Sequence, residues 1–93
     1  MVKFRNAKKT LEFDILTKTK GFIAEAIEDG HTVREYFQFK EIHQIILHPN
    51  TGIEIVGYND SRRVFYNDVA GEALVMFNLI TGTMNTWMNT NLN

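Results

Sequence analysis

The segment that decides the fold is residues 68–81, DVAGEALVMFNLIT, in which apolar residues return every three or four positions. This spacing places them on one side of a helix. The stripe consists of Ala70, Ala73, Phe77 and Ile80. Asp68 is suited to accept hydrogen bonds from the first free amides of the helix, and Gly82 suits a C-terminal cap. The pattern predicts one helix, from Asp68 to about Thr81, with Phe77 and Ile80 as its buried anchors.

The segment after Gly82 has two interpretations. Met84 and Trp87 continue the helical stripe, but Gly82 and the nearby threonines are poor helix formers. We expect the shorter helix, with Met84 to Met88 packing as an irregular extension. Its residues Met84, Trp87 and Met88 are then candidates for an interface with a second copy, which would make the protein a homodimer. The asparagine-rich residues 85–93 are a candidate for disorder.

Everything before the helix has the pattern of strands separated by turns. Leu11, Phe13 and Ile15, for example, alternate with acidic residues, as in a half-buried strand. The same reasoning gives seven candidate strands: 2–5, 11–17, 22–28, 32–39, 42–48, 53–58 and 62–66. Because 93 residues rarely divide further, we expect a single domain over residues 1–93. The predicted fold class is mainly β with one C-terminal α-helix.

The strongest local signal is Asp29-Gly30, because a type I′ hairpin turn requires positive φ at both central positions. Placing Glu28 opposite His31 fixes the register of the flanking strands. That register pairs Ala26 with Val33, Ala24 with Glu35, Phe22 with Phe37, Glu25 with Arg34 and Ile23 with Tyr36. Glu35 then lies on an otherwise apolar face, so it is either at the sheet edge or paired internally.

Two segments carry a resemblance to a known family. Residues 36–45, YFQFKEIHQI, are similar to the join between the two sheets of PH/GRAM-like (pleckstrin-homology-like) domains. Residues 64–68, VFYND, resemble the approach to the helix of those domains. Seven antiparallel strands and then one helix is also the element order of that superfold. The resemblance implies a compact PH-like domain of bacterial or phage type, in which a seven-strand antiparallel roll is capped by the helix.

In that superfold two curved sheets pack nearly orthogonally and the helix closes one open corner. Phe77 and Ile80 are then expected to enter a core of Phe13, Ile15, Phe37, Phe39, Ile46, Ile55 and Phe65. The resemblance also implies that the loops after the first, third and sixth strands gather at an open mouth, where family members bind acidic headgroups or peptides. The residues expected to bind such a ligand here are Lys8, Lys9, His31, Arg62 and Arg63.

Composition narrows the classes of function. There is no cysteine, which excludes a disulfide framework, a thiolate metal site and a cysteine nucleophile. The three histidines lack metal-binding spacing, and we expect His43 to stack on Tyr58. No catalytic motif or phosphate-binding glycine loop occurs, so we expect no enzyme activity, cofactor or metal. The opening Met-Val-Lys-Phe-Arg does not resemble a signal peptide and no stretch is long enough for a membrane span, which favours a soluble cytoplasmic protein.

Charge is unevenly distributed although the net charge is −1. Residues 1–20 carry six Lys or Arg and two acidic residues, whereas residues 21–93 carry four and nine. The basic segment, with Phe4 and Phe13, keeps a nucleic-acid-binding protein as an alternative. We favour a non-enzymatic protein-interaction module, a small adaptor, inhibitor or regulator that binds a partner protein or an acidic ligand. Exposed edge strands are suited to this role because they pair readily with another chain.

Overall fold

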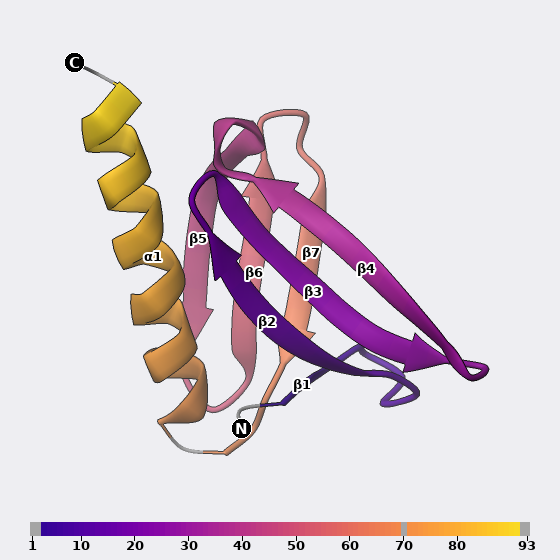
Figure 1. Cartoon of the computed structure of the whole chain (residues 1–93). Helices are drawn as coiled ribbons and strands as arrows, with labels where there is room; N and C mark the ends of the chain where they lie inside the picture. The colour runs from indigo at the N-terminus through magenta and orange to yellow at the C-terminus, as the bar shows by residue number, and fades with distance from the viewer. Residues whose placement is uncertain (1–2, 70, 92–93) are drawn as a thin grey trace.

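Seven antiparallel strands precede one C-terminal helix in the computed structural model, which describes residues 3–69 and 71–91 (Figure 1). The strands are β1 (Phe4–Arg5), β2 (Glu12–Lys18), β3 (Gly21–Glu28), β4 (His31–Gln38), β5 (Ile42–His48), β6 (Gly52–Gly57) and β7 (Arg62–Tyr66). A short 3-10 helix, η1 (Phe39–Glu41), joins β4 to β5, and the final helix is α1 (Glu72–Asn91). The predicted fold class is confirmed. Each predicted strand has a counterpart here, and the predicted start at residue 2 lies outside the described residues.

The strands form one continuous sheet in the order β4-β3-β2-β1-β7-β6-β5. Figure 1 shows β2, β3 and β4 lying across β5, β6 and β7, with the short β1 between the two halves. Because the sheet folds back on itself without closing, β4 and β5 remain its two edges. Helix α1 packs against β2 and β5 and covers one side of the fold.

The hairpin of β3 and β4 has the register that the sequence predicts. Glu28 pairs with His31, Ala24 with Glu35 and Phe22 with Phe37. Both turn residues adopt positive φ, 52° at Asp29 and 79° at Gly30, as a type I′ turn requires. Alternation on a sheet has a period of two, so this register decides which side chains of β4 face the core and which remain free at the edge.

The core lies between the folded sheet and α1. Six of the predicted core residues are buried: Phe13, Ile15, Phe39, Ile55, Phe65 and Ile80. Phe37 and Phe77 are half-buried and pack against them. The prediction for Ile46 is wrong, because a β-bulge between Ile42 and Gln44 shifts the alternation of β5 and puts Ile45 in the core instead.

Helix α1 is longer than predicted, since it continues through Gly82 to Asn91. The irregular extension expected at Met84–Met88 and the disorder expected at residues 85–91 are therefore wrong, and residues 92–93 lie outside the described residues. Met84 and Trp87 explain the difference, because both pack against the core and Trp87 lies 6.0 Å from the Phe39 ring. Tertiary packing of this stripe outweighs the roughly 1 kcal/mol that a helical glycine costs.

The start of α1 also differs from the prediction, because Asn67 rather than Asp68 organises it. The Asn67 side chain is buried at 3% exposure. Its Oδ1 accepts a hydrogen bond from the Val69 amide at 2.8 Å, and its Nδ2 donates to the Lys3 carbonyl and to Glu72 Oε1, both at 2.9 Å. This one amide therefore connects the end of β7 to the first strand and to the first turn of the helix.

Candidate functional site

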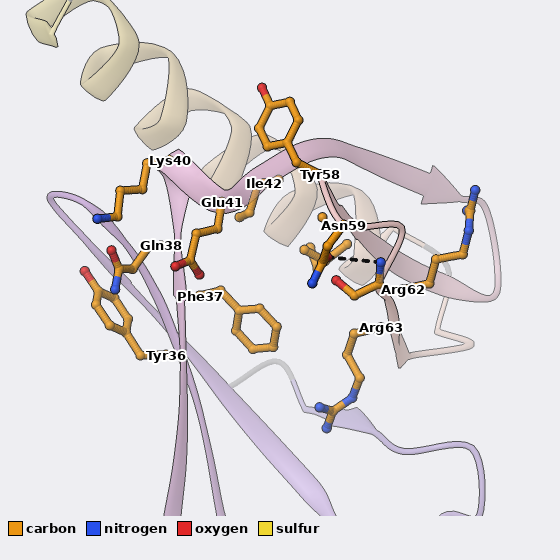
Figure 2. Close-up of a pocket in the computed structure, with 13 residues that line it drawn as sticks. Tyr36, Phe37, Gln38, Lys40, Glu41, Ile42, Tyr58, Asn59, Arg62 and Arg63 are labelled. Atoms are coloured by element: carbon orange, nitrogen blue, oxygen red, sulfur yellow. Dashed lines mark hydrogen bonds between the residues drawn. The ribbon is translucent and has the colours of Figure 1, made fainter.

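The candidate site is a cleft of about 730 Å³ where edge strand β4 faces the β6–β7 hairpin. We call it the edge cleft. One wall is the end of β4 with η1 and the start of β5: Tyr36, Phe37, Gln38, Lys40, Glu41 and Ile42. The other wall is the β6–β7 hairpin: Ile55, Gly57, Tyr58, Asn59, Ser61, Arg62 and Arg63. Figure 2 shows these side chains.

Three aromatic residues, Tyr36, Phe37 and Tyr58, are among those that line the edge cleft. Figure 2 shows the Phe37 ring near its centre, between Glu41 and Arg63. Phe37 stacks on Phe22 at 4.8 Å between ring centroids and meets Phe65 edge-on, so its orientation is fixed by the core. Tyr58 stands at the rim and is 69% exposed, whereas the Tyr36 ring, 51% exposed, lies on the other side of β4 from Phe37, over Gly21 (Figure 2). An exposed tyrosine beside a fixed apolar floor is typical of protein-binding surfaces.

Arg63 closes the bottom of the edge cleft by joining its two walls. Its Nη2 donates to Glu35 Oε1 at 2.8 Å and its Nη1 donates to Glu35 Oε2. The guanidinium also lies over the Phe65 ring at 4.9 Å and the Phe13 ring at 5.5 Å. Glu35 is therefore both at the sheet edge and paired. Arg63 therefore positions β4 against β7, and the role predicted for it as a ligand-binding cation stays a prediction.

Arg62 lies at the outer end of the cleft and belongs to a ladder across three strands. Its Nη1 donates to Glu54 Oε2 at 2.9 Å, and Glu54 Oε1 lies 2.9 Å from Nε2 of His48. His48 and Arg62 together hold the pKa of Glu54 below its usual range. Arg62 itself remains 61% exposed on its side chain, so it stays accessible to a ligand as well.

The β6–β7 hairpin turn that forms the second wall is built tightly. The Gly57 amide donates to the Ser61 carbonyl at 2.9 Å, and the Ser61 amide donates to Asn59 Oδ1 at 3.2 Å. A Cβ at Gly57 would lie 2.6 Å from the Ser61 hydroxyl and 2.9 Å from Asn59 Oδ1, so a larger residue there would displace these two side chains. His43 stacks on Tyr58 at 5.0 Å, as the sequence predicted. These contacts fix the tyrosine at the rim.

The structure does not bring the five predicted ligand-binding residues together. Arg62 and Arg63 line the edge cleft, but Lys9 lies beside Tyr66 and Asn67 at the other end of β7. Five residues of strand separate the ends of β7 by about 13 Å. Lys8 is exposed in the same β1–β2 loop as Lys9, and His31 is exposed at the tip of the β3–β4 hairpin (Figure 1). The expected single mouth is therefore divided into separate surfaces.

The predicted interface residues also lie on different faces of α1. Met84 and Trp87 are half-buried and pack against the core, whereas Met88 is 41% exposed. Sequence reasoning missed Tyr36, Phe37, Lys40 and Tyr58 as cleft residues. The signal that would have found them is the position of Tyr36 and Phe37 at the end of an edge strand, directly before the chain crosses to the other half of the sheet.

The lining of the edge cleft combines aromatic, amide, hydroxyl and charged side chains. Among residues 3–69 and 71–91, no group of three or more His, Asp and Glu side chains is close enough to hold a metal ion. Within the same residues no helix is long and apolar enough to cross a membrane. Comparison of the chain with family models, characterised proteins and solved structures found no match. The resemblance to PH/GRAM-like domains therefore stays a prediction.

Proposed function

We propose that this protein is a non-enzymatic protein-interaction module that binds an extended segment of a partner protein in the edge cleft, alongside β4. The observation that carries the proposal is the coincidence of a sheet edge with an aromatic cleft. β4 is a terminal strand of the sheet, and the cleft begins at its last residues, Tyr36 to Gln38.

A sheet edge supplies half of the binding chemistry. Along an edge strand, every second residue directs its amide and carbonyl outwards, where a second strand finds hydrogen-bonding partners. β4 has eight residues, which is about 26 Å of strand. Main-chain hydrogen bonds give such an added strand its affinity, and pockets for alternate side chains give specificity. The edge cleft provides such a pocket at the C-terminal end of β4.

The side chains of the cleft define the class of segment. Phe37 and the exposed Tyr58 favour an apolar or aromatic residue of the ligand. Lys40 is exposed and has no ion-pair partner among the described residues, and Arg62 is exposed on the opposite wall. These two cations favour acidic residues beside the apolar one. An extended segment with an apolar anchor and neighbouring Asp or Glu fits this surface.

The nucleic-acid alternative gains no support from the positions of its residues. Phe4 is 0% exposed and Phe13 is 2% exposed, so neither ring is available for stacking on bases. The basic residues are also dispersed. Lys3 pairs with Asp14 at 2.8 Å, Lys8 and Lys9 lie in the β1–β2 loop, and Lys18 and Lys20 lie at the opposite end of β2.

Selection from a displayed library of random peptides tests the proposal. We expect enriched peptides to combine an apolar or aromatic residue with acidic residues. Lys40→Glu and Tyr58→Ala should each weaken a selected peptide about tenfold or more, because hot-spot residues typically contribute 1.4 kcal/mol or more. Ile27→Ala is the matched control, since Ile27 is 72% exposed but lies on β3 outside the cleft. Failure to enrich any peptide, or binding that ignores both cleft substitutions, would overturn the proposal.

A further inference from the structure

The outer face of α1 is a second surface that the edge cleft does not explain. Of the 20 residues of this helix, Glu72 alone is ionisable. Val75 and Leu79 are 61% and 48% exposed, and Gly82 and Thr86 follow on the same side of the helix. Glu72, Val75, Leu79, Gly82 and Thr86 are spaced by three, four, three and four residues. This is the spacing with which one helix packs along another.

The threonine hydroxyls on this side of α1 are already hydrogen-bonded within the helix. The hydroxyls of Thr83, Thr86 and Thr90 donate to the carbonyls of Leu79, Gly82 and Thr86, at 2.8, 3.1 and 2.9 Å. Because each hydroxyl bonds back to the helix, it needs no other partner when the face is covered. The face can therefore be buried without leaving those polar groups unsatisfied.

A groove runs along this face beside the β2–β3 turn and has a volume of about 840 Å³. Leu79, Gly82 and Trp87 line it from the helix, and Lys18 and Lys20 line it from the turn. Gly82 leaves open space, since a Cβ there would meet no other atom within 4 Å. A second helix is therefore able to approach the backbone of α1 closely at this point.

The charged residues at the two ends of α1 indicate which molecule covers the groove. Asp68 and Glu72 lie at the N-terminal end of α1, while Lys18 and Lys20 lie beside its C-terminal half. None of these four side chains has an ion-pair partner in the described part of the chain. The acidic and the basic end of one copy are thus complementary to those of a second copy placed in the opposite direction.

The geometry of α1 suits a two-fold axis at Gly82. This residue stands ten positions after Glu72 and nine before Asn91, at the middle of the helix. Two antiparallel copies that cross there place the Glu72 end of each against the lysine-bearing half of the other, so both charge contacts form twice. A parallel arrangement would instead put the lysines of the two copies together.

We infer that α1 is a self-association surface, on which two copies of this chain pack antiparallel about Gly82 with Asp68 and Glu72 of each facing Lys18 and Lys20 of the other. The edge cleft is lined by β4, η1, β5, β6, β7 and the β6–β7 turn, and no residue lines both the cleft and the groove. Trp87, the only tryptophan of the chain, lines the groove and reports on its coverage.

Sedimentation equilibrium of the full chain tests the inference, together with acrylamide quenching of Trp87. Over concentrations up to about 1 mM, where even a small interface associates, we expect a monomer–dimer equilibrium and a fall in quenching as dimer forms. Leu79→Glu should weaken the dimer at least tenfold. Ile27→Glu, which also charges an exposed apolar residue, should leave it unchanged. A chain that stays monomeric throughout, or a dimer indifferent to Leu79→Glu, would overturn the inference.

Charge reversal tests the antiparallel arrangement itself. Glu72→Lys alone, or Lys18→Glu with Lys20→Glu, should each weaken homodimers by about tenfold through repulsion at the interface. Mixing the two variants should restore a heterodimer of wild-type strength, because both charge contacts are then attractive again. Circular dichroism of each variant should match the wild type, which separates dimer loss from unfolding. If the mixture associates no better than its components, the antiparallel charge pairing is wrong.

Discussion

Arg63 on β7 and Glu35 on β4 are paired side chain to side chain across the open side of the folded sheet, although 28 residues separate them in the chain. β4 is hydrogen-bonded to the sheet only through β3, and this pair, together with the Phe37–Phe65 ring contact, connects it to the other half. The guanidinium also covers the Phe65 ring. The contact holds the two walls of the edge cleft at a fixed separation, which is what a preorganised binding site requires.

Removal of Arg63 should loosen the cleft more than it destabilises the protein. The side chains of Arg63 and Glu35 are both more than a third exposed, so solvent weakens their ion pair. Arg63→Ala should therefore lower the free energy of unfolding by only about 1 kcal/mol, partly through lost packing on Phe65. Urea denaturation measures this. Arg34→Ala is the control: its pair with Glu25 is on the exposed face of the same hairpin, and its loss should cost less than about 0.5 kcal/mol. Equal effects would mean that the Arg63 pair has no special role.

Asn67 should be among the least replaceable residues of the chain. Its buried amide makes hydrogen bonds to Val69, Lys3 and Glu72. Asn67→Ala should lower the free energy of unfolding by about 2–3 kcal/mol, because several partners are left unsatisfied at once. Asn67→Asp keeps the shape but removes the donors and adds repulsion against Glu72, so it should cost at least as much. Chemical denaturation in which the aspartate variant matches the wild type would contradict this account.

Stability should fall at acid pH partly because of Glu54. His48 and Arg62 lower the pKa of its carboxyl in the folded protein. A lowered folded pKa means that the stabilisation is present above the unfolded value, about 4.3, and is lost as pH falls through the folded value. Glu54→Gln should therefore be less stable than the wild type near neutral pH, and this difference in the free energy of unfolding should shrink below about pH 4. Urea titrations between about pH 3 and pH 7 measure it, and a difference between variant and wild type that is constant with pH would contradict the assignment.

Gly82→Ala should stabilise the monomer by about 0.5–1 kcal/mol, because alanine is the better helix former and its methyl group meets no atom beyond the adjacent backbone of its own helix. Thermal or chemical unfolding at low concentration, where monomer predominates, measures this gain. Gly30→Ala is a useful contrast: its φ of 79° makes the same substitution strained, so it should destabilise the protein. A loss of monomer stability at Gly82 would contradict the open geometry of that helix face.

Local patterns in the sequence were sufficient for the strands but not for the helix ends. The Asp29-Gly30 turn fixed the β3–β4 register because its backbone requirements are met by few sequences. The extension of α1 depends on Met84 and Trp87 reaching a core that other strands build. Propensity at Gly82 points the other way, so only the tertiary contact decides the outcome. The bulge in β5 had no local signal either, and it reversed the roles of Ile45 and Ile46.

The candidate site was harder to predict than the fold because it depends on which loops meet. Lys9 and Arg62 are both positively charged, but Arg62 lies at the start of β7 and Lys9 lies beside its end. Arg63 looked like a free cation until its partner Glu35 was brought across from another hairpin. Tyr58, which stands at the rim, carries no sequence signature of a site. Its importance follows from its exposure opposite an edge strand, which is a property of the assembled sheet.

The central claim is that an extended segment adds to the edge of β4 in the aromatic cleft. Nuclear magnetic resonance of the isotope-labelled protein with a peptide selected by display tests it most directly, through contacts between peptide backbone and β4 backbone. We predict cross-strand contacts to β4 and shift changes at Tyr36, Phe37 and Tyr58, with little change at Ile27. Contacts confined to the outer face of α1 or to the β1–β2 loop, with β4 unaffected, would contradict the account.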